Sequence, residues 1–184
     1  MLARANALYE AGGDGVRDGL ALFDLERANI DAGFALAAGA AADDDALARL
    51  CSGYCGAGAY VLDLRQHPRR RIDWLQAARA AARRLGDRQM EGNHTGTLGL
   101  AHAALGEVRR AIEFYEQVLT IVRELGDRRG EGSALFNMAL AFEDLGERDK
   151  ALAHMDEARR ICEEIEAPLA QRAAAQLAEW RSPA

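Results

Sequence analysis

The sequence has little cysteine and no long apolar run, and each shortage excludes a class of protein. Three cysteines among 184 residues are too few, and odd in number, for a secreted disulfide framework, which favours a reducing compartment. No stretch reaches the roughly 20 apolar residues of a membrane-spanning helix. Residues 1–13 also lack the charged-then-apolar layout of a signal peptide. We therefore expect a cytoplasmic protein that does not bind a membrane.

Few stretches alternate apolar and polar residues as a strand does, so we expect an all-α chain. Nucleotide-binding motifs are missing as well. The stretch EGNHTGTLGLAHAALGE, residues 91–107, brings Gly92, Gly96 and Gly99 close together, as a phosphate loop would. It has neither the GxxxxGK[ST] spacing nor the βαβ setting that such loops need. We expect helix positions instead, with Gly99 allowing a neighbouring helix to approach closely.

Charge is unevenly distributed along the chain, whose net charge is −6. Residues 65–90 carry eight arginines against two aspartates, whereas residues 141–166 carry nine acidic residues against four basic ones. A general nucleic-acid binder would have a dominant basic surface, so no nucleic-acid partner is expected. These arginines either only face solvent and keep the protein soluble, or contact an acidic surface. That surface could belong to a partner or to the acidic segment of a second copy. The latter would give a weak homo-oligomer that dissociates in salt.

A repeat with a period of 40 residues organises the second half of the chain. Residues 86–107 and 126–147 are identical at ten of 22 positions. Each unit predicts two helices. In residues 108–125, apolar side chains recur every three or four positions, and charged residues occupy the other face. Each LGD or LGE triplet places glycine where a helix can end, next to an acid that can begin the following helix. Pro68 suits a first helical turn.

These repeats resemble tetratricopeptide (TPR) repeats, in which small residues lie where two helices cross and larger ones fill the gaps. The 40-residue period resembles the longer-helix variety of bacterial signalling proteins. The residues that carry the resemblance in the middle unit are Leu98, Gly99, His102, Leu105, Gly106, Ala111, Tyr115 and Val118. In the next unit they are Met138, Ala139, Phe142, Leu145, Gly146, Ala151, Met155 and Ala158.

A second resemblance concerns residues 21–39, ALFDLERANIDAGFALAAG. They are similar to the helix that joins the nucleotide-binding part of STAND-class (NB-ARC-like) signalling ATPases to their TPR sensor. No P-loop precedes them, so ATP binding is not carried over and no cofactor is expected.

The implied fold is a right-handed α-solenoid of antiparallel helix hairpins, closed by a terminal helix at each end. Its expected parts are an N-terminal packing segment (1–44), a degenerate repeat (45–86), two repeats (87–126 and 127–166) and a C-terminal capping helix with a tail (167–184).

Such stacked hairpins line a concave groove with the first helix of each unit. The resemblance implies a non-catalytic module that binds a peptide or helix in this groove, as sensor or scaffold of a bacterial signalling system. The expected groove residues are Tyr60, Asn93, Gly96, Thr97, Leu100, Phe136, Asn137, Leu140 and Asp144. Alternatively, these residues contact the terminal helices of the same chain, or the chain is a structural scaffold that assembles with itself end to end or through complementary charge.

Two further constellations remain. Arg71, Arg79 and Arg83 share a predicted helix face and are candidates for docking an acidic partner. Cys51 and Cys55 lie one helical turn apart, but structural zinc sites favour CxxC pairs and four recognisable ligands. We expect buried thiols, no metal and no enzyme, because no nucleophile and base come together in the sequence.

Overall fold

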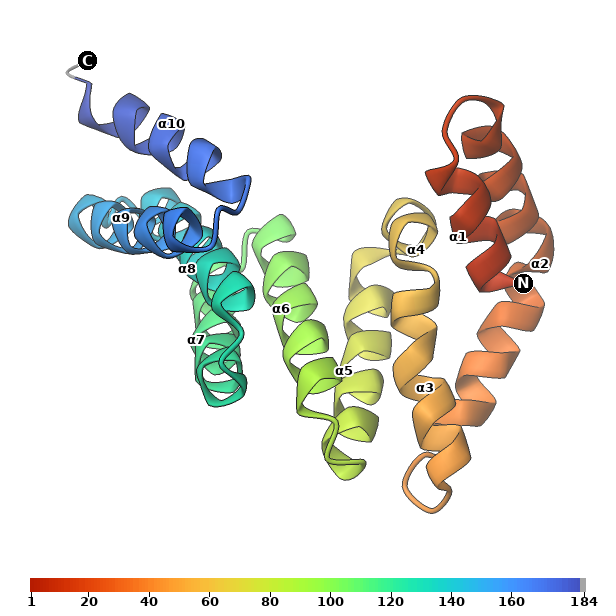
Figure 1. Cartoon of the computed structure of the whole chain (residues 1–184). Coiled ribbons are helices and arrows are strands. Elements are labelled where there is room, and N and C mark those ends of the chain that lie inside the picture. Colours follow the sequence, from red (N-terminus) through yellow and green to blue (C-terminus); the bar gives the residue numbers. More distant parts are fainter. Residues whose placement is uncertain (183–184) are drawn as a thin grey trace. The chain divides into compact units, whose positions relative to one another are not determined.

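The computed structural model describes residues 1–182, and within them the chain is entirely helical, as predicted (Figure 1). The last two residues of the expected C-terminal tail lie outside this range. Consecutive helices are packed as hairpins, which is the arrangement of a TPR α-solenoid. The ten helices of the described residues are α1 (Leu2–Glu10), α2 (Asp14–Ala40), α3 (Asp45–Ala57), α4 (Ala59–Arg65), α5 (Pro68–Arg84), α6 (Arg88–Ala104), α7 (Val108–Leu125), α8 (Arg128–Asp144), α9 (Arg148–Glu164) and α10 (Leu169–Arg181).

The helices form two compact units, Met1–His94 and Thr95–Ala184, which we call unit 1 and unit 2. The boundary falls within α6, so the first half of this helix belongs to unit 1 and the second half to unit 2. Each unit has its own buried core and is described by itself.

In unit 1, α1 packs on α2, and α3 packs on both α2 and α5. The core contains an aromatic group in which Phe34 stacks on Trp74, with ring centroids 3.9 Å apart, and Tyr54 meets both rings edge-on. Residues 45–66 form two helices, because α3 ends at Gly58. A Cβ on Gly58 would lie 2.3 Å from Leu2 Cδ1, so this glycine admits α1.

In unit 2, α7, α8, α9 and α10 pack in sequence. Alanines of α8 and α9 are buried in one core together with larger residues such as Leu135, Phe142 and Met155. Ala173, Leu177 and Trp180 of α10 belong to the same core. The C-terminal helix therefore covers apolar surface of α9 that would otherwise face solvent.

The LGD and LGE triplets end helices as predicted, because their glycines adopt a left-handed backbone. Gly86, Gly106, Gly126 and Gly146 have φ between 68° and 75°, a region that other residues enter only at a cost. Asp87 and Asp127 then accept hydrogen bonds from the N–H groups of Met90 and Gly130, as N-caps do.

The glutamates of the other two triplets do not cap a helix. Neither Glu107 nor Glu147 accepts a side-chain capping bond. Glu107 pairs instead with Nδ1 of His102 at 2.6 Å, and Glu147 accepts from Nζ of Lys150 at 2.6 Å. The longer glutamate side chain thus reaches past the helix start to another partner. Pro68 is the first residue of α5, where its missing N–H needs no partner.

Candidate functional site

Of the predicted groove residues of unit 2, those on α6 and Asn137 and Asp144 of α8 are half-buried or exposed, whereas Phe136 and Leu140 belong to or pack against the core. Leu100 is 51% exposed, although it is a large apolar side chain. Gly96 and Thr97 lie one turn before it on α6 and are half-buried. On α8, Asn137 and Leu140 are also half-buried. The exposed Asp144 is the last residue of that helix.

Helical spacing explains why these side chains stay outside. On α6, Leu98, Gly99 and His102 are buried against the neighbouring helix, and Thr97 and Leu100 fall on the opposite side of the same turns. The 40-residue repeat then places Asn137 and Leu140 of α8 where Thr97 and Leu100 lie on α6. The two helices therefore present the same alternation of a polar and an apolar side chain.

Phe136 differs from the other predicted groove residues because α10 covers it. Its side chain is 6% exposed, and the guanidinium of Arg172 lies over the ring, 5.2 Å from its centroid. This contact is the one that the alternative interpretation expects, in which a terminal helix of the chain occupies part of the groove. The open part of the surface within unit 2 is therefore centred on Leu100, with the half-buried Leu140 packed against the core.

Tyr60 and Asn93 lie in unit 1, whereas the other predicted groove residues lie in unit 2. The Tyr60 ring is 53% exposed and stacks on Tyr9, with centroids 5.9 Å apart. Its backbone N–H donates to Oδ1 of Asn6 at 3.0 Å. Asn93 is exposed on α6 and accepts a hydrogen bond from Gln89 at 3.4 Å.

The predicted arginine surface is largely paired inside unit 1. Five of these arginines form ion pairs, with acids both near and far in the sequence. The pairs are Arg65 with Asp24, Arg70 with Asp31, Arg71 with Asp63, Arg83 with Glu91 and Arg84 with Asp45. The Arg71 side chain is 5% exposed, so it offers an acidic partner little surface. Arg79 and Arg83 line a depression of about 420 Å³ on α5. Burial and the charge of Arg83 lower the pKa of Arg79.

Two clusters of charged residues that we did not predict join consecutive hairpins. In unit 1, the buried carboxylate of Glu91 accepts from Arg83 Nε at 2.9 Å and from Arg88 Nη1 at 2.6 Å. In unit 2, Glu131 accepts from Arg123 Nε at 2.7 Å and from Arg128 Nη1 at 2.5 Å. These residues correspond at the 40-residue period, and the identical GDR and EG residues around them are the signal in the sequence that could have found them.

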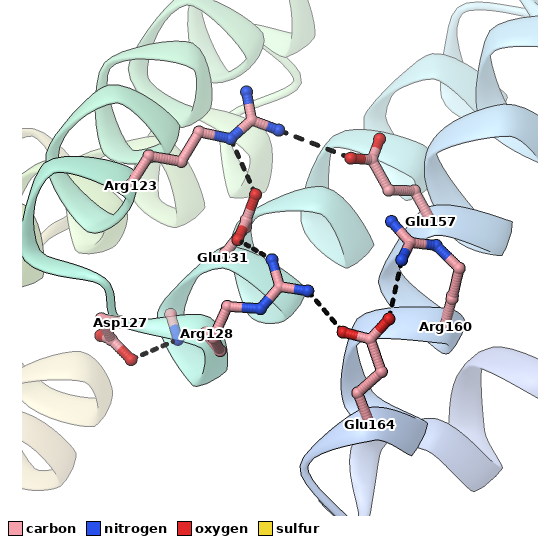
Figure 2. Close-up of polar contacts among 8 residues, drawn as sticks. Arg123, Asp127, Arg128, Glu131, Glu157, Arg160 and Glu164 are labelled. Carbon is pink, nitrogen blue, oxygen red and sulfur yellow. Dashed lines mark hydrogen bonds and ion pairs between the residues drawn. The ribbon is translucent and has the colours of Figure 1, made fainter.

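Figure 2 shows how the cluster of unit 2 extends to α9. Arg123 reaches Glu157 at 3.5 Å, and Arg128 reaches Glu164 at 2.6 Å, where Arg160 also binds. The network therefore ties the end of α7 and the start of α8 to the face of α9.

The two glutamates at the centres of these clusters remain ionised. Burial alone would raise the pKa of Glu131, but hydrogen bonds from Arg123 and Arg128, with their positive charges, lower it below its usual value. The same balance lowers the pKa of Glu91, with Arg88 and Arg83 as donors. Each carboxylate thus holds two arginines from two successive helices.

The candidate zinc residues are buried in unit 1. Cys51 and Cys55 are free thiols with less than 5% exposure, and burial raises the pKa of Cys55 to about 11. Next to them, Nε2 of His94 lies 3.0 Å from Ser52 Oγ. Burial, helped by the charge of Arg71, lowers the pKa of His94 to about 4. Within residues 1–182, no three His, Cys, Asp or Glu side chains come together as a metal site.

The glycine-rich stretch is helical, as predicted, because α6 runs through it. A Cβ on Gly99 would lie 2.4 Å from the Tyr115 ring, so glycine lets α7 approach α6. Packing does not require glycine at position 96, because a Cβ there would lie 3.7 Å from Val118 Cγ2, an ordinary contact distance. His102 is buried and stacks on Phe114 with centroids 5.1 Å apart, which is a packing role.

A cleft of about 520 Å³ opens in unit 1 among α1, α2 and α3. Ile30, Leu50 and Tyr54 supply apolar wall, and Glu26 and Arg49 are its charged residues. No predicted site residue lines it, and no repeat marks it in the sequence.

Across the described residues, no helix combines the length and the apolar composition that a bilayer crossing requires.

Residues 91–164 match the tetratricopeptide repeat family. No curated protein sequence matches the chain significantly. Among solved structures, the chain is similar to BtubC (BKLC) from P. vanneervenii, with a TM-score of 0.68 and 18% identity over 85% of this chain and 65% of that one. It is also similar to the apo form of RapI, with a TM-score of 0.65 and 16% identity over 70% of this chain and 36% of that one.

A third similar structure is PH0952 from Pyrococcus horikoshii, a Signal Transduction ATPase with Numerous Domains (STAND) with a tetratricopeptide repeat sensor. The TM-score is 0.60, and the identity is 16% over 75% of this chain and 20% of that one. The chain thus spans less than two thirds of each of these structures. At such identities the likeness concerns the fold.

Proposed function

We propose that this tetratricopeptide repeat protein, whose family match covers residues 91–164, binds a helical or apolar peptide of a protein partner on the outer surface of α6 and α8. TPR domains are generally protein-interaction modules, and they are typically non-catalytic. Stacked helix pairs offer an extended surface for binding. The chain would serve as the sensor or scaffold part of a bacterial signalling system.

The exposure of Leu100 is the observation that carries this proposal. Leu100 is half exposed, and the half-buried Gly96 and Thr97 lie one turn before it on the same helix. Leu140 occupies the same position 40 residues later, and Asp144 lies one turn beyond it. Apolar side chains with a polar rim suit the apolar face of an amphipathic helix.

The sensor role is supported by the similarity to PH0952, whose TPR part is a sensor. Residues 21–39, which resemble the helix that precedes such a sensor, form most of α2. The similarity covers one fifth of PH0952, so only the sensing part comes into consideration for this chain.

Because α10 already covers Phe136, the proposed ligand contacts Leu100, Thr97, Leu140 and Asn137 and not the Phe136 ring. This division makes the two interpretations of the groove compatible. The terminal helix occupies one end, and a partner occupies the other.

Substitution of Leu100 by aspartate tests the proposal. A displayed library of amphipathic helical peptides is selected against the chain, and the affinity of the selected peptides is measured for each variant. We expect L100D to weaken binding by about tenfold or more, which corresponds to roughly 1.4 kcal/mol. The matched control is L125D, a 43% exposed leucine of the same unit at the end of α7, which should bind as the unchanged chain does. Circular dichroism verifies that both variants keep their helices. Equal losses in both variants, or a library without binders, would contradict the proposal.

A further inference from the structure

Helix α2 has an apolar face that no other described helix of unit 1 covers. Its core side carries Phe23, Ile30 and Phe34, all less than 9% exposed. On the other side, Leu25 is 78% exposed and Leu36 is 68% exposed. These are the two most exposed leucines of the described residues. The exposed residues that share this outer face are Ala21, Leu25, Ala28, Ala32, Ala35, Leu36 and Gly39.

No charged residue interrupts the outer face between residues 21 and 39. Two of the charged residues in this part of α2, Asp24 and Asp31, lie at the flanks of this face and pair within unit 1. Asp24 pairs with Arg65 at 3.1 Å, and Asp31 pairs with Arg70 at 2.9 Å. Figure 1 shows α1 and α3 beside α2, and both pack against its core side. A helix with apolar residues on two sides is typical of a buried helix, not of one at a surface.

We propose that the outer face of α2 packs antiparallel against the same face of a second copy of the chain. The pattern on this face is nearly symmetric about residue 30. Ala28 and Ala32 lie two positions from it, Leu25 lies five, and Leu36 lies six. A two-fold axis at residue 30 therefore places Ala28 level with Ala32 of the other copy and Leu25 level with Leu36. An interface between identical chains that is closed by a two-fold axis needs this kind of self-complementary surface.

Side-chain size supports the same arrangement. The small side chains of Ala28 and Ala32 at the centre allow the two backbones to approach closely. Leu25 and Leu36 lie on one edge of the face, and a two-fold axis between the helices keeps the leucines of both copies on that edge. Each leucine then packs against the leucine of the other copy instead of facing water.

Charge favours the antiparallel direction over the parallel one. A parallel pair would set Asp18 of one copy level with Asp18 of the other, which is unfavourable for like charges. The antiparallel pair brings Arg17 level with Asp43, an exposed residue in the turn after α2. It also opposes the two helix dipoles.

The size of the face sets the expected strength. The stretch from residue 21 to 39 is about 27 Å long at 1.5 Å per residue, and packed helices lie roughly 8–10 Å apart. Such a contact buries a few hundred Å² per copy, below the roughly 800 Å² of a standard interface. We therefore expect a reversible dimer of micromolar affinity. Being apolar, it should persist in high salt, whereas association through the arginines of α5 and an acidic helix would dissociate there.

Sedimentation of the full chain across protein and salt concentrations tests the interface. We expect a monomer–dimer equilibrium that 1 M salt (about a 3 Å screening length) does not weaken. The double variant L25D/L36D should raise the dissociation constant by about tenfold or more. The matched control L64D changes a 56% exposed leucine of α4 in the same unit and should leave the equilibrium unchanged. A chain that is monomeric at every concentration, or a dimer that survives L25D/L36D, would overturn the proposal.

Cysteine cross-linking tests the direction. The native cysteines are buried, so they should contribute little cross-linking between copies. The A28C and A32C proteins are oxidised separately and as a mixture. The antiparallel pair predicts that the mixed 28–32 disulfide forms faster than either homodimeric disulfide, because only that pair is level. Faster formation of the 28–28 disulfide would show a parallel pair and overturn the arrangement. Neither experiment depends on the proposed peptide-binding surface of unit 2.

Discussion

Replacing Glu131 with glutamine should destabilise unit 2 by about 2 kcal/mol. The change keeps the size of the side chain but removes the charge that Arg123 and Arg128 share. A hydrogen bond to a charged group contributes roughly 1.5–3 kcal/mol. The two arginines are about half exposed and keep Glu157 and Glu164 as partners, so they regain solvation. The loss should therefore stay below the roughly 3–5 kcal/mol of a fully buried pair that loses one partner.

The two tryptophans allow each unit to be followed separately. Trp180 lies in the core of unit 2 and Trp74 in that of unit 1, and the chain has no other tryptophan. In a W74F background, the fluorescence of Trp180 reports urea unfolding of unit 2. With a urea dependence of about 2 kcal/mol per molar, the expected loss lowers the midpoint by roughly 1 M.

Glu164 provides the matched control, because it accepts from the same Arg128 but is half exposed. The E164Q variant should cost less than about 0.5 kcal/mol, as exposed ion pairs do. Equal midpoint shifts in E131Q and E164Q would refute the argument that burial makes Glu131 important.

The effect of E131Q should also depend on pH. Because the folded pKa of Glu131 is lowered, its contribution is complete above the unfolded value of about 4.3 and disappears as pH falls through the folded pKa. The difference between the unchanged chain and E131Q should therefore vanish in strong acid. A difference that persists there would contradict an electrostatic origin.

Two other predictions concern single residues. Gly99→Ala should destabilise unit 2, although alanine is the better helix former, because its Cβ would meet the Tyr115 ring. Gly96→Ala has room beside Val118 and should stabilise unit 2 by up to about 1 kcal/mol, so urea midpoints that move in the same direction would disprove the packing argument. His94, with an ordinary pKa of 6.5 and a folded pKa of about 4, should cost unit 1 about 3 kcal/mol of stability as pH falls through this interval, because the unfolded chain takes up the proton first. Trp74 fluorescence in a W180F background should show this loss, and the same pH slope in H94Q would exclude His94 as its source.

The helices of the repeats could be predicted because their signals are local. A glycine at the end of an apolar stripe adopts the left-handed backbone whatever surrounds it, and Gly86 and Gly126 end their helices as expected. The helix through Gly96 and Gly99 could be predicted because this stretch has neither the spacing nor the setting of a phosphate loop, and α6 confirms the helix.

The partners of the arginines could not be predicted in the same way. Residues 65–90 look strongly basic when only the acids within the segment are counted. The structure brings Asp24, Asp31 and Asp45 to them from α2 and α3, and these pairings depend on how the helices pack. Likewise, the break at Gly58 follows from the approach of Leu2, a contact between residues far apart in sequence. The groove residues of unit 2 and the docking role of Arg79 and Arg83 stay predictions.

The charged clusters at Glu91 and Glu131 suggest that the protein can be lengthened one hairpin at a time. Each cluster takes one arginine from the end of a hairpin and a glutamate and an arginine from the start of the next, and both use the same positions of the 40-residue period. A duplicate of residues 87–126 inserted after Gly126 would therefore meet a matching arginine before it and a matching glutamate after it. Growth of the array by duplication would leave no buried carboxylate without its two arginines.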